Sequence, residues 1–214
     1  MKIFNSLTRS VEEFTHDNDT SVSIYTCGPT VYSYVTIGNY RTYILGDILK
    51  RVLEFNNFKT KYIMNLTDVG HLTGDNEGDA DTGEDRIEKA VKKEGKSVKE
   101  ITTFYTKDFM RGYKLLNMLE PNKFSKATEY IDEMINFVVE LEDLGYTYET
   151  SDGIYFDTSK FENYGQLSGM NDENVLEGAR VEVNLEKRNP TDFAVWKLSP
   201  EGVDRAQEWQ SPRG

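Results

Sequence analysis

Apolar residues form short runs in the first third of the chain, and their spacing changes from one run to the next. The run 22–25 ends near the breaker Gly28-Pro29 and predicts a buried strand. A second run at 62–66 predicts another strand. Between them, apolar residues at helical spacing predict a helix over 38–56: Ile37, Tyr40, Ile44, Ile48, Val52 and Phe55. Strand, helix and strand in this order indicate a βαβ unit with parallel strands.

The middle of the chain has helical periodicity, and the expected helix ends carry capping residues. One helix is expected between Thr82, as its N-cap, and Gly95, as its stop. The capping box at 97–100, Ser-Val-Lys-Glu, predicts the start of a long helix that stops before Pro121. A third helix is expected over about 127–144.

After residue 145, apolar residues recur at every second position. Tyr146, Tyr148, Ile154 and Phe156 alternate around the turn residues 151–153 and predict a β-hairpin. The whole pattern therefore predicts an α/β fold: half of a doubly wound parallel sheet, a helical segment and a small β-rich insertion. In open parallel sheets, ligands bind at the carboxyl ends of the strands. Cys27, the only cysteine, lies at such an end.

The composition is that of an ordinary globular protein, with 37% apolar and 29% charged residues among 214. No apolar run approaches the ~20 residues of a membrane span, and no signal-peptide pattern opens the chain. We therefore expect a cytoplasmic protein without a membrane partner. The net charge of −12 argues against general nucleic-acid adhesion. The basic clusters fit solvated surface: Lys89, Lys92, Lys93 and Lys96, and Arg180, Lys187 and Arg188.

Common catalytic and cofactor motifs are missing from the sequence. It contains neither a Gly-x-Gly-x-x-Gly turn after the first strand nor a Walker A pattern nor a Cys-x-x-Cys pair. His16 and His71 lie far apart and give little support for a nucleophilic pair with a serine or cysteine. The residues alone thus indicate an α/β domain that binds a nucleotide or a small molecule.

Two neighbouring motifs carry a resemblance. Cys27-Gly28-Pro29-Thr30-Val31-Tyr32, followed by Thr36-Ile37-Gly38-Asn39, resembles the active-site signature of the cysteinyl-tRNA synthetase family of class I aminoacyl-tRNA synthetases. Further similar segments lie at 4–9, 65–69, 189–197 and 209–214, so the resemblance covers the whole chain.

The resemblance implies a Rossmann-like catalytic domain and an activity. Cysteine would react with ATP to give cysteinyl-adenylate, and the cysteinyl group would pass to tRNA(Cys). Cysteine, ATP with magnesium, and tRNA(Cys) are then the expected partners, and the full-length enzyme is expected to be a monomer.

The resemblance also implies roles for individual residues. Thr36 and Asn39 match catalytic positions, and Gly28, Thr30 and Thr67 match positions that line the cysteine pocket. Cys27 matches the first ligand of a zinc ion that binds the substrate thiolate, a soft ligand that suits zinc. The ATP signature region comprises Pro29, Thr30, Val31, Tyr32, Ser33, Tyr34, Val35, Thr36, Ile37, Gly38 and Asn39. Simpler interpretations are a small apolar core residue for Cys27 and turn or strand-end residues for Thr30 and Thr67.

The chain departs from the family pattern in two respects. The class signature has histidine where this chain has Thr36, which donates one hydrogen bond but carries no charge. The resemblance also covers only about the first half of a typical member: residues 1–120 match the first half of the catalytic domain, and 121–214 match the connective insertion. The other zinc ligands and the Lys-Met-Ser-Lys-Ser loop would follow Gly214. We therefore expect the isolated chain to be inactive or nearly so.

Two alternatives fit the same residues. One is a related ligase that couples activated cysteine to an amino sugar, which a comparison of acceptors would separate from a synthetase. The other is a non-catalytic domain of the same fold that binds a nucleotide, a metal or a partner protein, which tight adenylate binding without turnover would support.

Overall fold

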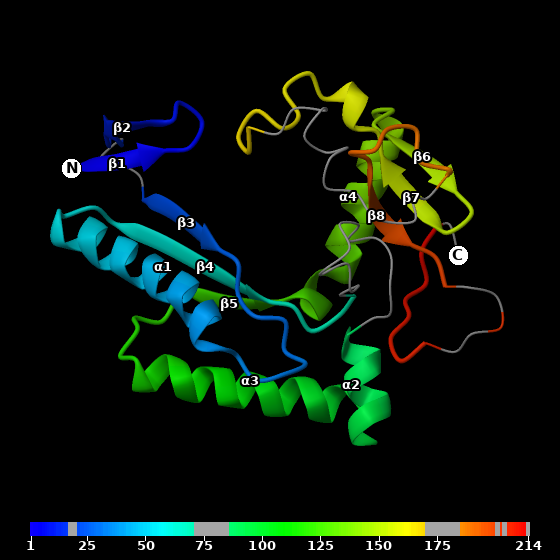
Figure 1. Cartoon of the computed structure of the whole chain (residues 1–214), viewed down its shortest axis with the longest axis horizontal. Coiled ribbons are helices and arrows are strands. Elements are labelled where there is room, and N and C mark those ends of the chain that lie inside the picture. Colours follow the sequence, from blue (N-terminus) through cyan, green and yellow to red (C-terminus); the bar gives the residue numbers. More distant parts are fainter. Residues whose placement is uncertain (17–20, 71–85, 170–184, 200–201, 203–204, 213–214) are drawn as a thin grey trace. The chain divides into compact units, whose positions relative to one another are not determined.

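The computed structural model describes residues 1–16, 21–70, 86–169, 185–199, 202 and 205–212 (Figure 1). The described residues form two compact units. The first is built from residues 1–3, 11–70 and 86–129, and the second from residues 4–10 and from residue 130 onward. The first contains a parallel sheet with three helices, and the second contains an antiparallel sheet with one α-helix. Near the N-terminus, β1 (Lys2–Asn5) and β2 (Ser10–Glu13) form a separate two-stranded sheet.

The sheet of the first unit has the order β3-β4-β5, and all three strands are parallel. Its elements are β3 (Val22–Thr26), α1 (Ile37–Phe55), β4 (Thr60–Leu66), α2 (Arg86–Glu94), α3 (Val98–Leu115) and β5 (Lys123–Lys126). Val22 pairs with Thr60, and Ile63 pairs with Lys123. The predicted βαβ unit is confirmed, and β5 is a third strand that the apolar pattern did not predict.

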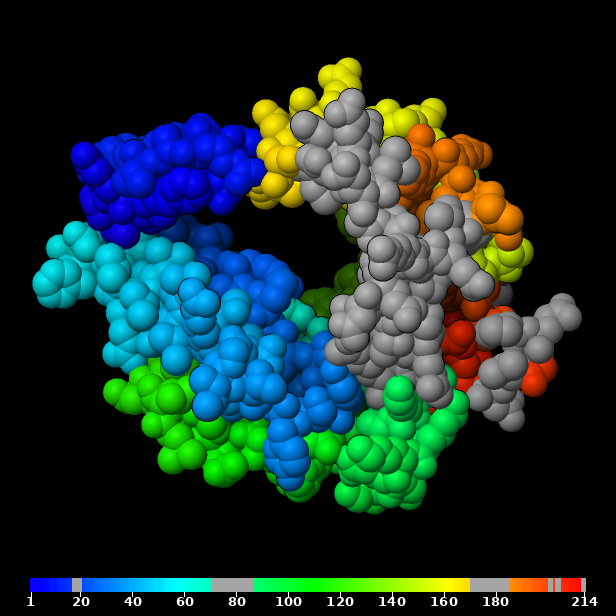
Figure 2. Space-filling model, in the orientation of Figure 1, coloured from blue at the N-terminus to red at the C-terminus, as the bar shows by residue number. Residues whose placement is uncertain are grey.

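The core lies between one face of this sheet and the helices α1 and α3. Along β3, Val22 and Ile24 are buried whereas Tyr25, which points to the other face, is 63% exposed. Both helices lie on the same side of the sheet (Figure 1). In the space-filling view, the blue and cyan atoms of α1 lie directly against the green atoms of α3 (Figure 2). The core side chains are Val22, Ile24, Val31, Tyr43, Leu53, Tyr62, Met64, Leu66, Ile101, Tyr105, Phe109, Tyr113 and Met118.

The helix α1 begins one residue before the predicted range, and its packed face includes one carboxylate beside the apolar and aromatic side chains. Of the residues that predicted it, Ile37 and Phe55 are 91% and 88% exposed. Asp47 is buried instead and accepts hydrogen bonds from Arg51 Nε at 2.8 Å and from the backbone N–H of Leu119 at 2.7 Å. These bonds tie α1 to the loop after α3.

The helix boundaries follow the predicted caps in most places. Ser97 and Glu100 form the predicted capping box of α3, and Gly95 follows α2 with φ +64°. Thr82 lies outside the described residues. The helix expected at 127–144 is divided into the 3₁₀ turn η1 (Ala127–Tyr130) and α4 (Ile131–Asp143).

In the second unit, α4 packs on an antiparallel sheet of order β6-β7-β8. The strands are β6 (Thr147–Thr150), β7 (Gly153–Phe156) and β8 (Phe193–Lys197), and the short 3₁₀ helix η2 (Thr158–Lys160) follows β7. The first two strands confirm the predicted hairpin.

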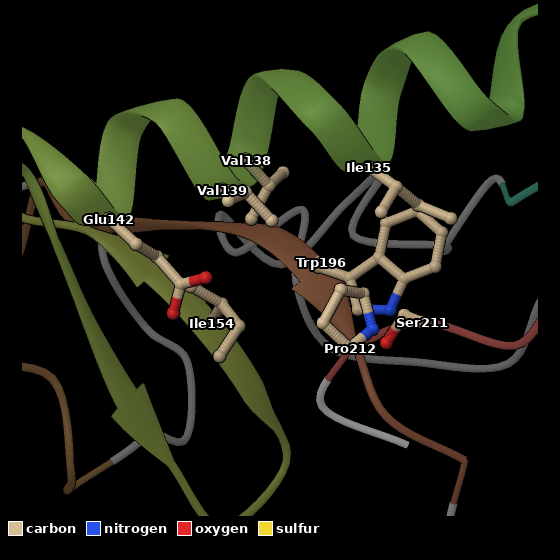
Figure 3. Close-up of a pocket in the computed structure, with 8 residues that line it drawn as sticks. All are labelled: Ile135, Val138, Val139, Glu142, Ile154, Trp196, Ser211 and Pro212. Atoms are coloured by element: carbon tan, nitrogen blue, oxygen red, sulfur yellow. The ribbon is translucent and has the colours of Figure 1, made fainter.

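A small pocket remains between α4, the sheet and the segment that contains Ser211 (Figure 3). Ile135 and Val139 project from α4 toward the sheet, and the Trp196 ring lies between Ile135 and Pro212 (Figure 3). Because apolar side chains form most of its wall, this pocket is a packing space in the core of the unit. Among the described residues, no helix is long and apolar enough to cross a lipid bilayer.

Candidate active site

The carboxyl ends of β3 and β4 are joined by the signature segment. Thr30 and Thr67 form an isolated parallel bridge. The N–H of Val31 donates to the Thr67 carbonyl oxygen, and the N–H of Thr67 donates to the Pro29 carbonyl oxygen, both at 3.0 Å. The chain therefore continues alongside β4 after β3 has ended, and this continuation places the two threonines, predicted as pocket residues, side by side.

Gly28 lies where only a glycine fits. A Cβ on this residue would overlap the Asn65 carbonyl oxygen and would lie 2.9 Å from Met64 Cγ. The backbone around Cys27 and Gly28 is thereby held against β4. The Cys27 side chain, however, is exposed. The interpretation of Cys27 as a small apolar core residue therefore does not describe its surroundings.

Asn65 connects the groups at this edge. Its Oδ1 accepts hydrogen bonds from the Gly28 N–H at 2.9 Å and from the Tyr25 hydroxyl at 3.1 Å. Its Nδ2 donates to Thr67 Oγ1 at 3.0 Å. Residue 65 lies in one of the segments that resemble the family, but no role was predicted for it. The available signal was one amide side chain within the otherwise apolar run Tyr-Ile-Met-Asn-Leu.

The two predicted catalytic side chains contact each other at the start of α1. Thr36 is the N-cap: its Oγ1 accepts from the Asn39 N–H at 3.3 Å and donates to Asn39 Oδ1 at 2.7 Å. Asn39 Oδ1 also accepts from the Thr36 N–H at 3.1 Å. The first turn of α1 contains no acidic residue. A helix N-terminus of this kind favours an anion, because its backbone N–H groups and its dipole both present positive charge.

Other residues of the signature region support the loop between β3 and α1. Pro29 and Val31 are buried, whereas Ser33, Ile37 and Gly38 are exposed. The Tyr34 ring lies edge-on to Tyr105 of α3, with centroids 5.2 Å apart. The loop is thus anchored on α3 by an aromatic contact while its ends remain at the surface.

The predicted site residues form two groups. Cys27, Gly28, Thr30 and Thr67 lie at the edge of the sheet, and Thr36 and Asn39 lie at the start of α1. Within the described part of the chain, no hydrogen bond joins a residue of one group to a residue of the other.

Electrostatics near Cys27 act on two tyrosines. Burial, followed by the charge of Cys27, raises the pKa of Tyr25 above its ordinary value. Burial raises the pKa of Tyr43 to about 12, with further contributions from Tyr40 and Cys27. Both hydroxyls therefore keep their protons at neutral pH and act as hydrogen-bond donors or acceptors rather than as bases.

A zinc ion needs at least three protein ligands. The residues that the structure describes contain no group of three histidine, cysteine or carboxylate side chains that could hold a metal ion. Cys27 supplies one thiol and does not form a zinc site with its described neighbours.

Comparison with known families decides the assignment. The model of the family described as "tRNA synthetases class I (C) catalytic domain" matches residues 13–214. The chain belongs to this family. Membership confirms the resemblance to class I aminoacyl-tRNA synthetases, and the parallel sheet with its helices is consistent with the Rossmann-like catalytic domain of the family.

Individual members of the family are similar to this chain over all of its 214 residues. It is 44% identical over 214 residues to a Burkholderia lata protein named Cysteine--tRNA ligase 1, of which it covers 44%. It is 42% identical to proteins named Cysteine--tRNA ligase from Treponema denticola and Borrelia hermsii, and it covers 43% and 44% of them. The chain thus spans less than half the length of these family members.

Proposed function

We propose that this chain forms part of the site in which a cysteine–tRNA ligase activates cysteine with ATP. The observation that carries this proposal is the exposed Cys27 followed by Gly28, which is held against β4 where a Cβ would not fit. These two residues open the signature of a family whose similar members are named for cysteine and tRNA.

The proposed reaction needs no nucleophile from the protein. The cysteine carboxylate attacks the α-phosphorus of ATP, the bond to the pyrophosphate group breaks, and cysteinyl-adenylate forms. A hydroxyl at the 3′ end of tRNA(Cys) then attacks the cysteinyl carbonyl carbon, and AMP leaves. Catalysis of such steps depends on positioning and on electrostatic stabilisation of the phosphates.

The proposed roles follow the two groups of residues. The N-terminus of α1, with Thr36 and Asn39, stabilises the phosphates of ATP, whose magnesium ion is bound with the nucleotide. Asn39 Nδ2 makes no hydrogen bond to any residue that the structure describes, so its two hydrogens are available to a phosphate oxygen. Thr36 Oγ1 gives its hydrogen to Asn39 and acts by holding that amide in place.

Gly28, Thr30 and Thr67 are proposed to orient cysteine at the sheet edge. Cys27 is proposed as one ligand of a zinc ion that would bind the substrate thiolate and favour it over a serine hydroxyl. Its described neighbours do not complete a zinc site, so no step is assigned to the ion. We further propose that the enzyme acts as a monomer in the cytoplasm.

Charging of tRNA tests this proposal. The natural polypeptide that carries this sequence, with its intact mass determined first, is incubated with ATP, magnesium, zinc and radiolabelled cysteine. The proposal predicts label in tRNA(Cys), and serine in place of cysteine is the control that should leave the tRNA unlabelled. Transfer to an amino sugar instead of tRNA would identify the related ligase. Tight binding of cysteinyl-adenylate without any transfer would identify a non-catalytic domain.

A further inference from the structure

We propose that Asn65 is a positioning residue which makes the Thr67 hydroxyl a hydrogen-bond donor toward the amino-acid substrate. The inference rests on the proposed function, because it takes the edge formed by β3 and β4 as the place where cysteine binds. It concerns a residue for which no role was predicted, and it is carried by the hydrogen bonds around the Asn65 amide.

The orientation of the Asn65 amide is fixed by one partner that can only donate. The backbone N–H of Gly28 lies 2.9 Å from Oδ1, so this atom has to be the oxygen of the amide. The Tyr25 hydroxyl at 3.1 Å then donates to the same oxygen. The Nδ2 group is therefore the atom that faces Thr67 Oγ1 at 3.0 Å.

The polarity of the Thr67 hydroxyl follows from this orientation. An amide nitrogen donates and does not accept, so Thr67 Oγ1 is the acceptor of this bond. The Thr67 hydrogen cannot point at Asn65 and has to point elsewhere. The hydroxyl makes no other hydrogen bond to the residues that the structure describes, and Thr67 is half-buried at the end of β4. One oriented donor therefore remains at the sheet edge.

The chemistry of the ligand group follows from the donor. A hydroxyl hydrogen needs an acceptor. Apart from the thiolate, which is proposed to bind the zinc ion, the acceptors of cysteine are its carboxylate oxygens, one of which becomes the carbonyl oxygen of the adenylate. The Gly28 N–H already donates to Asn65, so it does not compete for the same oxygen. Gly28 thus contributes space at this edge, and Thr67 contributes the hydrogen bond.

The substitution N65D reverses this polarity with almost no change in shape. An aspartate places an acceptor oxygen where Nδ2 lay, so the Thr67 hydrogen turns toward residue 65 and is lost to the substrate. T67V removes the hydroxyl altogether. If Asn65 acts through Thr67, either change raises the KM and the Kd for cysteine about tenfold, the typical effect of one hydrogen bond. The KM for ATP should remain within about twofold.

The double variant N65D/T67V separates positioning from a general structural effect. When one residue acts through another, the free-energy effects of the two substitutions do not add. The double variant should therefore lose about tenfold in cysteine affinity rather than about a hundredfold. The matched control uses Thr30, which pairs with Thr67 in the bridge but makes no hydrogen bond to Asn65 in the part of the chain that the structure describes. In the double variant N65D/T30V, the losses in cysteine affinity of the two single variants should multiply.

The measurements are the KM values in cysteine-dependent ATP–pyrophosphate exchange and the Kd of cysteine by calorimetry, both with the natural polypeptide. The inference is wrong if N65D/T67V loses a hundredfold in cysteine affinity, or if N65D has an unchanged KM for cysteine. In both cases, cysteine-dependent exchange by the wild type would still support the proposed function. A wild type that neither binds cysteine nor supports exchange overturns both. If N65D does not fold, N65A takes its place in the cycle, with the same expected non-additivity toward T67V.

Discussion

Asp68, directly after the end of β4, accepts two hydrogen bonds from Thr128: one from its backbone N–H at 2.9 Å and one from its hydroxyl at 2.7 Å. Asp68 is 7% exposed, so its carboxylate is held inside the first unit. The pair ties the end of β4 to the turn after β5. Thr128 lies in the 3₁₀ turn η1, so this contact holds the start of the segment in which the helix was expected from residue 127.

Replacing Asp68 by alanine should destabilise the protein by about 2 kcal/mol, because the N–H and the hydroxyl of the half-buried Thr128 would lose their partner. T128V removes only the hydroxyl bond and should cost about 1 kcal/mol. Urea unfolding followed by circular dichroism measures both values. A loss below about 0.5 kcal/mol for D68A would show that this pair contributes little.

Gly112 of α3 should resist substitution although alanine is the better helix former. A Cβ there would overlap the Tyr40 hydroxyl and would lie 2.6 Å from Tyr40 Cζ. That ring cannot move freely, because its hydroxyl donates to the Phe109 carbonyl oxygen at 3.1 Å. We expect G112A to lose about 1–3 kcal/mol.

The matched control for this glycine is Gly38, near the start of α1. A Cβ at Gly38 would meet its nearest atom, Thr36 Oγ1, at 3.6 Å. We expect G38A to be neutral or to gain up to about 1 kcal/mol. Equal thermal midpoints for G112A and G38A would contradict the proposed clash with Tyr40.

Stability should fall at low pH through Asp192, which is 2% exposed. Burial alone would raise the pKa of Asp192, but hydrogen bonds from Thr158, Tyr148 and Asn189 outweigh it and hold the pKa below its ordinary value. A carboxyl whose pKa is lowered by folding stabilises the protein above its unfolded pKa, and this contribution is lost as the pH falls through the folded pKa.

We therefore expect D192N to be less stable than the wild type at pH 7, and the difference to shrink from about pH 5 downward. Urea unfolding between pH 3 and pH 7 measures this difference. The control D143N changes an exposed carboxylate at the C-terminal end of α4 and should stay within about 0.5 kcal/mol of the wild type at pH 7. A difference between D192N and wild type that is independent of pH would contradict this account.

Thr36 should stabilise α1 whatever its role with ATP. Its side chain caps the helix, and T36A removes the bond that Thr36 Oγ1 accepts from the Asn39 N–H and the bond that it donates to Asn39 Oδ1. The bond from the backbone N–H of residue 36 to Asn39 Oδ1 does not depend on the threonine side chain. We expect T36A to cost about 1 kcal/mol in unfolding free energy and T36S to remain close to wild type. Because the cap also holds Asn39, the KM for ATP should rise in T36A and not in T36S. An ATP KM that is unchanged in T36A would separate the cap from phosphate binding.

The apolar pattern predicted β3, α1 and β4 well, because strands and helices that bury one face leave a period in the sequence. The pattern missed β5, whose residues Lys-Phe-Ser-Lys include one apolar side chain. This strand depends on its backbone pairing with β4 and on Phe124, which packs edge-on to Phe109 and Tyr113 at 6.0 and 5.6 Å. A local pattern of apolar residues does not predict contacts between segments that are distant in the sequence.

The residues of the candidate site could be proposed from the sequence, but the contacts among them could not. The motifs named Cys27, Gly28 and Thr67, but two of the partners of Asn65, Tyr25 and Gly28, lie at the end of β3 and meet Asn65 only after the strands pair. The capping role of Thr36 was missed for a different reason. Its partner at the third helical position is Asn39, whereas the usual capping box has a glutamate or glutamine there.

The measurement that tests the central claim most directly is ATP–pyrophosphate exchange by the natural polypeptide, with and without cysteine, for the wild type and for Cys27→Ala. The account predicts exchange that requires cysteine, needs no tRNA, and falls at least about a hundredfold in C27A, with an unchanged thermal midpoint because the Cys27 side chain is exposed. Cysteine-dependent exchange at the wild-type rate in C27A would contradict the account, and so would a folded wild type that shows no exchange.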